Sequence, residues 1–383
     1  MERTAQPLRI ALLAPLIAPI ASPFIGGGQV LVADLARGLQ ERGHVLTLFA
    51  ASGSHVPGIS IRAIPVLPGE LTPADFSAGA ANGPSAAFFR GAELFLEIYR
   101  EIRNGGNFDV VHAHAFDWPA YAFGALLTGP PVVHTMHLPA VDPAITALLA
   151  QTFAATGSSH TVTVSQACAA TYAAHFPFDR VIYNGVDAAA IPFGAEADDY
   201  LLFVGRMSPE KGADQAIAVA QQLGCRLVLA GGIYDRAFFE GTIAPRLTDP
   251  LLNYRGHLAR EEVYALMGRA RCLLFTSRWA EPFGLTLAEA QAAGTPVVAF
   301  DCGAAREIVV SGRTGYLVPP GDIPAAAAAV TATARLDRAA CRRHIAEHFS
   351  LERMILAYED YYYSKLEAAR SATAPGGIDA INQ

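Results

Sequence analysis

The 383-residue sequence is poor in charged residues and has no excess of positive charge. Only 16% of its residues are Asp, Glu, Lys or Arg, and the formal net charge is -7. This balance gives the chain no general attraction for nucleic acid or anionic lipid. Because 52% of the residues are hydrophobic, the composition favours large buried cores over disorder, and the length favours two or three domains.

The sequence also lacks a C-x-x-C pair and a hydrophobic run long enough to span a bilayer. Its five cysteines are scattered, which is typical of a reduced, cytoplasmic protein without a zinc knuckle. Three prolines interrupt the apolar stretch at residues 10–25, so we interpret it as a buried strand and a loop rather than a signal peptide. We expect a cytoplasmic protein without a transmembrane segment. Peripheral contact with the inner membrane face and a homodimer both stay open.

Short runs rich in Val, Ile and Leu alternate with helical patterns along nearly the whole chain. This alternation is typical of parallel sheets covered by helices. It predicts one group of strands from RIALLAP to HTVTVS and a second group from YLLFVG to TPVVAF. The sequence therefore predicts an α/β protein of two doubly wound, Rossmann-like domains that face each other across a cleft. Ligands would bind there, at the carboxyl ends of the strands.

The expected domain boundary lies near residues 180–198, where Pro192 and Gly194 mark a hinge-like stretch. We assign residues 1–185 to an N-terminal domain and residues 186–350 to a C-terminal domain. The aromatic helix expected at residues 351–370 packs back on the first domain, and residues 371–383 form a disordered tail. Segment Leu67–Ser85, rich in Pro, Gly and Ala, predicts a mobile loop.

An anion site is predicted in the stretch EPFGLTLAEA, where the chain leaves the strand CLLFTS and enters a helix. Pro282 suits a helix entrance, and Gly284 lets the backbone approach a ligand. At the positive end of the helix dipole, free N–H groups bind phosphate. The groups expected to do so are those of Phe283, Gly284, Leu285 and Thr286.

Two carboxylates flank this anion site. Glu281 precedes the helix, and Glu289 lies within it. Carboxylates accept hydrogen bonds from sugar hydroxyls, so phosphate donors between two such acceptors describe a site for a nucleotide sugar. The alternative is two solvated glutamates beside an ordinary turn.

A second stretch, FVGRMSPEKG, supports the nucleotide-sugar interpretation. It ends a strand at Gly205 and then places Arg206 and Lys211 in the following loop. Two cations at the carboxyl end of a strand can neutralise a diphosphate. A solvated basic pair is the alternative.

Taken with GGGQ at residues 26–29, HTMH ending at His137, VIYNGVD and SGRTGYLVP, these motifs resemble the retaining glycosyltransferases of family 4, which have the GT-B fold. The resemblance covers nearly the whole chain, with the motifs in order. The stretches LDRAACRRHIAEHFSLERM and FPFDRVIYNGVD are also similar, more weakly, to a subgroup of tetrahydrobiopterin glucosyltransferases.

The resemblance implies roles for particular residues of the second domain. Arg206 and Lys211 would hold the donor diphosphate. Glu281 would contact hydroxyls of the donor sugar, and Glu289 would contact the nucleotide ribose.

In the first domain, the resemblance implies that a loop at Gly26 and Gly27 closes over the phosphates and that His137 approaches the transferred sugar. Gly28 departs from the family, since many relatives carry a β-branched residue there.

Other signals are set aside. The GGGQVL stretch lacks the third glycine of a dinucleotide fingerprint, so we do not expect NAD. His112 and His114 alternate on a strand, but two ligands rarely make a metal site. No Asp-x-Asp motif is present, and Arg206, Lys211 and the helix N-terminus can stabilise a leaving diphosphate without metal.

The sequence therefore predicts a metal-independent retaining transferase without a cofactor. It would move a hexose from a nucleoside diphosphate sugar, with UDP-glucose preferred, to a hydroxyl of a small molecule, glycan or lipid, a pterin included. No residue is placed as a covalent nucleophile, which favours a front-face mechanism. The alternatives are a nucleotide-sugar 2-epimerase and a non-catalytic nucleotide-sugar sensor.

Overall fold

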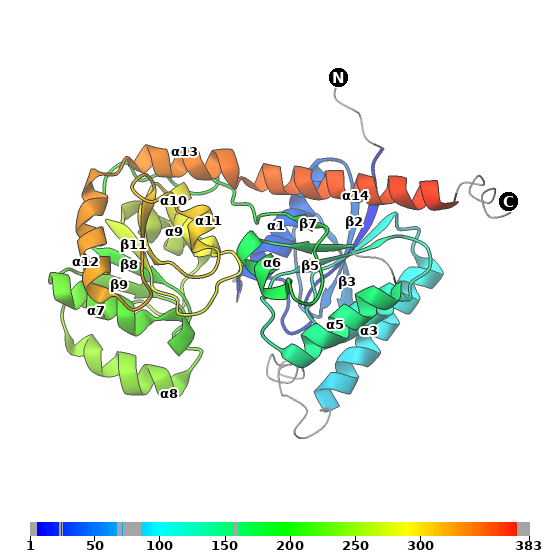
Figure 1. The fold of residues 1–383 in the computed structure, drawn as a ribbon, viewed down its shortest axis with the longest axis horizontal. Coiled ribbons are helices and arrows are strands. Elements are labelled where there is room, and N and C mark those ends of the chain that lie inside the picture. The colour runs from blue at the N-terminus through cyan, green and yellow to red at the C-terminus, as the bar shows by residue number, and fades with distance from the viewer. Residues whose placement is uncertain are drawn as a thin grey trace. The chain divides into compact units, whose positions relative to one another are not determined.

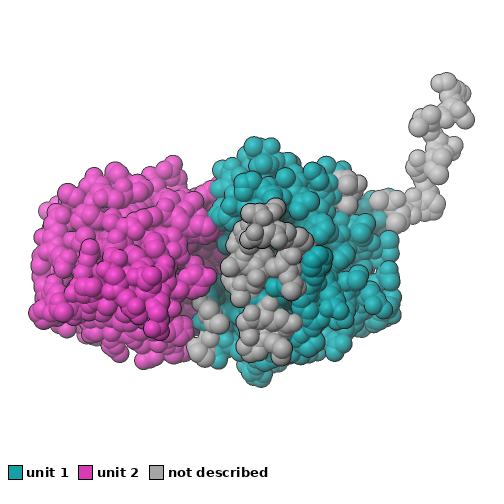
Figure 2. Space-filling model, turned by 90° about the horizontal axis from the view of Figure 1, so that it is seen from below, with its two compact units in different colours: residues 1–164, 169–182, 354–383 teal, residues 165–168, 183–353 magenta. Residues whose placement is uncertain are grey.

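The computed structural model describes residues 6–22, 24, 26–66, 71, 86–156 and 160–373. These residues divide into two α/β units. The first unit consists of the described residues within Met1–Val164, Ala169–Ile182 and Met354–Gln383. The second unit consists of Ser165–Cys168 and Tyr183–Arg353 (Figure 2). The chain thus passes to the second unit at Tyr183, within the expected boundary stretch of residues 180–198 and three residues before the assigned start at residue 186. It returns to the first unit inside its last helix.

The first unit contains a sheet in the order β3-β2-β1-β4-β5-β6-β7, in which every described pair of strands is parallel. This arrangement is typical of a Rossmann fold, with the switch point between β1 and β4. The strands are β1 Arg9–Leu13, β2 Val45–Ala51, β3 Ser60–Ile64, β4 Val110–Ala113, β5 Val132–Met136, β6 Thr161–Thr163 and β7 Arg180–Val181.

Helices cover both faces of the first sheet. In Figure 1, α3 and α5 lie on one face, and α1 and α14 lie on the other. The helices are α1 Gly27–Glu41, α3 Ala86–Gly105, α4 Trp118–Ala125, α5 Pro143–Thr156, α6 Gln166–Tyr172 and α14 Leu351–Thr373. On α3, Leu94, Ile98 and Ile102 recur every four residues and are buried in one core with residues of β1 and β4.

The second unit repeats the order of strands β1 to β6 of the first unit. Within the described residues, its sheet has the order β10-β9-β8-β11-β12-β13, again with parallel pairs. The strands are β8 Leu201–Val204, β9 Leu227–Ala230, β10 Leu252–Tyr254, β11 Cys272–Phe275, β12 Val297–Phe300 and β13 Gly315–Val318. The four central strands, β9, β8, β11 and β12, have nearly continuous burial, as expected for a sheet with both faces covered.

The helices of the second unit also form two layers: α7 packs with α12, and α10 packs with α9 and α13 (Figure 1). They are α7 Ala213–Leu223, α8 Arg236–Phe238, α9 Arg260–Arg269, α10 Leu285–Ala292, α11 Ala305–Ile308, α12 Ile323–Ala332 and α13 Arg338–His348. Shorter helical turns are η2 Pro209–Lys211, η3 Phe239–Ile243, η4 Ala244–Thr248 and η5 Thr333–Arg335.

Helix α14 packs on residues of the first unit. Ile355 fills the space beside Gly38 of α1, where any side chain would overlap it. Glu359 accepts hydrogen bonds from Arg42 Nε at 2.9 Å and pairs with His44 Nε2 at 2.9 Å. The apolar contact and these polar contacts together hold the C-terminal helix against α1.

The structure corrects several details of the sequence-based expectation. Strands β7 and β13 were not predicted. Helix α14 continues to Thr373, three residues into the predicted tail, and residues 374–383 lie outside the described part. The predicted mobile loop at residues 67–85 also lies outside it, apart from Leu71. Among the described helices, none is both long and apolar enough to cross a membrane.

Candidate functional site

The predicted donor residues of the second unit follow two adjacent strands. Gly205 and Arg206 come directly after β8, and Lys211 ends the short turn η2 that follows. Glu281 lies in the loop after β11. Because β8 and β11 are hydrogen-bonded parallel neighbours, their carboxyl ends lie side by side, and the two loops start at the same edge of the sheet.

Lys211 and Glu281 meet directly at this edge. Lys211 Nζ donates a hydrogen bond to Glu281 Oε1, and the two groups form an ion pair. The hydroxyl of Ser277 donates to the same carboxylate oxygen over 3.3 Å. Glu281 is only 8% exposed, so the pairing compensates a carboxylate that burial would otherwise destabilise.

Two glycines let the backbone bring this pair together. Gly212 adopts a left-handed conformation with φ of 73°, and a Cβ there would overlap the carbonyl of Thr276. Thr276 Oγ1 in turn donates to the Gly212 carbonyl over 2.8 Å. Gly303, with φ of 58°, lies against the backbone of Glu281, where a Cβ would also overlap.

Arg206 is held by an aromatic ring that the sequence did not indicate. Its guanidinium carbon lies 4.3 Å from the ring centroid of Tyr234, which follows β9. Arg206 Nη2 also lies 3.5 Å from Glu210 Oε1. Both Arg206 and Tyr234 are exposed, so the guanidinium is positioned while its remaining N–H groups stay accessible.

The predicted anion site at the start of α10 has the expected donors, but its helix begins later than predicted. Gly284, with φ of 87°, is the N-cap, so Pro282 lies two residues before the cap and not at the first helical position. The backbone N–H groups of residues 283–286 donate no hydrogen bond to any other described residue. Four donors at the positive end of the helix are therefore available to an anion.

Glu289 belongs to a cluster that the sequence did not predict. Tyr264 of α9 donates its hydroxyl to Glu289 Oε1 over 3.0 Å. Arg260 lies beside both residues: its Nε donates to the Tyr264 hydroxyl, and its Nη2 is 3.8 Å from Glu289 Oε1. Burial, with help from the Glu289 charge, raises the pKa of Tyr264, so the phenol stays a protonated donor.

In the first unit, the glycine motif starts a helix rather than forming a loop. Gly26 is the N-cap of α1, while Gly27 and Gly28 are its first two helical residues. The Gly26 N–H donates to Gln29 Oε1 over 3.3 Å, and Gln29 Nε2 donates to the carbonyl of Pro19 over 2.9 Å. Gly26 to Gly28 are exposed at the carboxyl end of β1.

His137 follows β5 at the carboxyl edge of the first sheet and is partly buried. Its Nε2 lies 2.9 Å from Nδ1 of His114, which follows β4. Burial lowers the pKa of His137 to about 4, so its imidazole is neutral at physiological pH. Within the described part of the chain, no three His, Cys, Asp or Glu residues form a group able to hold a metal ion.

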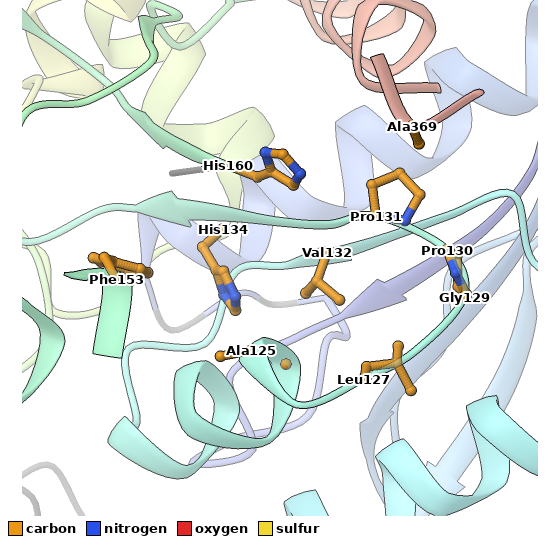
Figure 3. A pocket seen from close by; sticks show the side chains of 11 residues that line it. Ala125, Leu127, Gly129, Pro130, Pro131, Val132, His134, Phe153, His160 and Ala369 are labelled. Carbon is orange, nitrogen blue, oxygen red and sulfur yellow. The ribbon is translucent and has the colours of Figure 1, made fainter. Parts of the chain in front are cut away.

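A pocket of about 240 Å³ lies at the opposite, amino-terminal end of β5 in the first unit (Figure 3). His134, His160 and Phe153 line it, together with the loop that precedes Val132 and with Ala369 of α14. None of the predicted site residues lines this pocket.

The structure brings Arg206, Lys211, Glu281 and the start of α10 to one edge of the second sheet. It gives Glu289 and His137 polar partners of their own.

Comparison with known proteins agrees with this architecture. Residues 25–190 match the family model described as Glycosyltransferase Family 4, and residues 190–346 match Glycosyl transferases group 1. D-inositol 3-phosphate glycosyltransferase of Mycolicibacterium smegmatis is 30% identical over 389 residues, covering 89% of this chain and 87% of the relative. Glycogen synthase of Mycobacterium tuberculosis is 39% identical over 180 residues, and that match covers 43% of this chain but only 41% of the synthase.

Solved structures show the same fold. AviGT4, a glycosyltransferase involved in avilamycin A biosynthesis, is 27% identical with a TM-score of 0.67, covering 94% of this chain and 98% of that one. Sucrose-phosphate synthase from Thermosynechococcus elongatus is 21% identical with a TM-score of 0.77, covering 94% and 100%. Two Rossmann-like units, each built on a sheet of parallel strands, and the similarity to these proteins define the GT-B class. The chain belongs to family 4 of the glycosyltransferases.

Proposed function

We propose that this protein is a retaining glycosyltransferase that moves a hexose from a nucleoside diphosphate sugar to an acceptor hydroxyl. One observation carries the proposal: the ion pair of Lys211 and Glu281 lies at the same sheet edge as Arg206 and as the free N–H groups of α10. Such an edge combines donors for a diphosphate with a carboxylate acceptor for sugar hydroxyls.

The leaving diphosphate is the part of the donor that this edge would stabilise. Lys211 uses one N–H on Glu281 and has two more to offer to phosphate oxygens. Arg206 and the N–H groups of α10 would add further donors. Fixed positive groups of this kind stabilise the charge that develops on the diphosphate as the sugar departs, so the proposed reaction needs no metal ion or cofactor.

The two glutamates would then bind different parts of the donor. Glu281, next to the diphosphate-binding lysine, would accept from hydroxyls of the sugar. Glu289 would accept from the ribose hydroxyls, with its carboxylate oriented by Tyr264. We propose a front-face reaction, in which the acceptor attacks from the side that the diphosphate leaves and the anomeric configuration is retained.

UDP-glucose is the proposed donor because it is common in family 4 and fits the weaker resemblance to the pterin glucosyltransferases. The acceptor is proposed only as a hydroxyl compound, since the loops of the first unit that would select it carry no motif. A cytoplasmic location is proposed from the five cysteines, which form no disulfide with one another within the described residues.

A donor screen tests the function. The purified protein is incubated with UDP-glucose, UDP-galactose, GDP-mannose and ADP-glucose, and released nucleotide is measured. The preferred donor is then offered to sugars, inositol phosphates, lipids and a pterin. We expect one donor to be turned over and one acceptor class to accelerate that turnover. Isomerised nucleotide sugar without acceptor would instead indicate an epimerase.

A further inference from the structure

Three histidines and two tyrosines form a buried polar cluster in the first unit. His112 of β4 lies within hydrogen-bonding distance of Tyr362 Oη through Nδ1, at 2.6 Å, and of Thr135 Oγ1 through Nε2, at 2.7 Å. Tyr358 Oη lies 3.1 Å from the same threonine oxygen. Both ring nitrogens of His112 are therefore engaged, so its ring cannot turn without breaking a hydrogen bond.

His114 lies between this fixed ring and His137. Its ring centroid is 4.0 Å from that of His112 and 5.2 Å from that of His137, and it is nearly parallel to the latter, with an interplanar angle of 18°. His114 is 2% exposed. It is confined on both sides, and its one hydrogen bond to a described residue joins Nδ1 to Nε2 of His137.

The protonation of the pair restricts this hydrogen bond to two forms. Burial and the neighbouring histidines hold the pKa of His114 well below its usual range, and burial lowers that of His137, so both rings are neutral. A neutral imidazole carries one N–H and one bare nitrogen. Either His114 Nδ1–H donates to His137 Nε2, or His137 Nε2–H donates to His114 Nδ1.

The environment of His114 Nε2 distinguishes the two forms. This nitrogen is buried and has no hydrogen-bond partner among the described residues. In the second form it would carry the proton of His114 as a buried, unsatisfied N–H, which is rarer in proteins than an under-satisfied acceptor. The first form leaves Nε2 as a bare acceptor and places the proton of His137 on Nδ1.

We propose that His114 is a positioning residue: it donates its Nδ1 proton to Nε2 of His137 and so holds His137 as the tautomer with its proton on Nδ1. His137 then presents an N–H donor, not a basic nitrogen, from the end of β5. This inference rests on the proposed function, in which His137 approaches the transferred sugar. Its N–H would then donate to an oxygen of that sugar.

Three variants at position 114 test the proposal. In His114→Asn, the side-chain amide nitrogen takes the place of Nδ1 and can still donate to His137. His114→Leu has nearly the shape of the asparagine variant but no donor. In His114→Gln, the amide lies near the place of Nε2 and cannot take the place of Nδ1. This variant keeps a polar side chain, so it replaces His114→Leu if the leucine variant fails to fold.

The first readout is independent of activity. Two-bond ¹H–¹⁵N spectra of protein labelled at histidine nitrogen report which nitrogen of His137 carries its proton, and His137→Asn assigns the signal. We expect the Nδ1–H form in the wild type and in His114→Asn, and a mixture of tautomers in His114→Leu and His114→Gln. A protonated Nε2 of His137 in the wild type would overturn the proposal.

The second readout is kcat with the preferred donor. We expect His114→Leu and His114→Gln to lower kcat about ten- to a hundredfold with little change in the KM of the donor, and His114→Asn to stay within about threefold of wild type. Equal kcat losses in the asparagine and leucine variants would overturn the positioning role. If the spectra follow the proposal but His137→Ala keeps full activity, the positioning stands and the role of His137 in the proposed function fails.

Discussion

Lys211 and Glu281 are 70 positions apart in the sequence, yet their side chains form an ion pair at the carboxyl edge of the second sheet. The pair joins two residues that the motifs assign to different parts of the donor, the diphosphate and the sugar. In the proposed function this contact couples the two roles: a change at Glu281 would alter the charge that Lys211 presents to the diphosphate.

Replacing Lys211 with alanine should lower kcat/KM by about two orders of magnitude, because a charge aimed at a leaving diphosphate contributes roughly 3 kcal/mol. The matched control is Lys365→Ala. Lys365 has a similar side-chain exposure, 18% against 21% for Lys211, and also pairs with a carboxylate, that of Asp179. Steady-state kinetics should show a large loss in the first variant only. Equal activities would refute the diphosphate role.

Arg206→Ala should reduce kcat/KM to a similar degree, and Tyr234→Ala should have a smaller effect in the same direction because the ring only positions the guanidinium. Arg236→Ala is the control, since Arg236 is exposed and forms a comparable ion pair with Glu240 over 3.4 Å. A Tyr234→Ala variant with a greater loss than Arg206→Ala would show that Tyr234 contacts the donor itself.

The Glu281→Gln variant should lower kcat while free UDP binds as tightly as before or more tightly. The amide keeps the size of the side chain but no longer neutralises Lys211, so the full lysine charge faces the diphosphate. Titration calorimetry with UDP gives the affinity, and kinetics gives kcat. A marked loss of UDP affinity would contradict the assignment of Glu281 to the sugar.

The Glu289→Ala variant should weaken binding of UDP about ten- to a hundredfold, since a lost pair of charge-assisted hydrogen bonds costs about 1.5–3 kcal/mol. Tyr264→Phe should give a smaller loss of the same kind, because it removes the hydroxyl that orients the carboxylate. Neither variant should affect binding of pyrophosphate, which has no ribose. Normal UDP binding by Glu289→Ala, with a loss in Glu281→Gln, would reverse the order assigned along the donor.

Acid should destabilise the first unit between about pH 6.5 and 4. Burial lowers the pKa of His134 to about 3 and of His137 to about 4, so the unfolded chain binds more protons than the folded one in this range, and stability falls as the pH falls. Asp117 has the opposite effect on stability. Burial raises its pKa to about 7, so the folded state binds its proton more tightly than the unfolded chain, and this stabilisation is lost as the pH rises towards 7. Thermal unfolding of Asp117→Asn should therefore show a steeper dependence on pH than the wild type. A Tm of Asp117→Asn that does not change over this range would contradict the buried neutral histidines.

Much of the fold was predictable because buried parallel strands leave continuous apolar runs. RCLLFTS and TPVVAF mark β11 and β12 within a few residues. Strand β7 has only two residues at a sheet edge, and only half of β13 is fully buried, so neither leaves such a run. The start of α10 was placed too early because Pro282 suits a helix entrance, whereas the left-handed Gly284 caps the helix.

The donor residues were predictable because the motifs follow strand ends. Their partners were not, because they come from other elements: Tyr234 follows β9, and Tyr264 lies on α9. The contact of His112 with Tyr362 spans 250 positions, and no local pattern shows it. Sequence periodicity reports which face of an element is buried, but not which side chain from a distant element meets it.

The proposed reaction is a transfer from a nucleotide sugar with retention of configuration. The most direct test incubates the protein with UDP-glucose labelled with ¹³C in the sugar and with the acceptor found in the screen, and follows the anomeric carbon by NMR after EDTA treatment. We expect UDP to be released in equal amount to an α-linked product, without added metal. A β-linked product, or a reaction that stops with EDTA and resumes with Mg²⁺ or Mn²⁺, would contradict it.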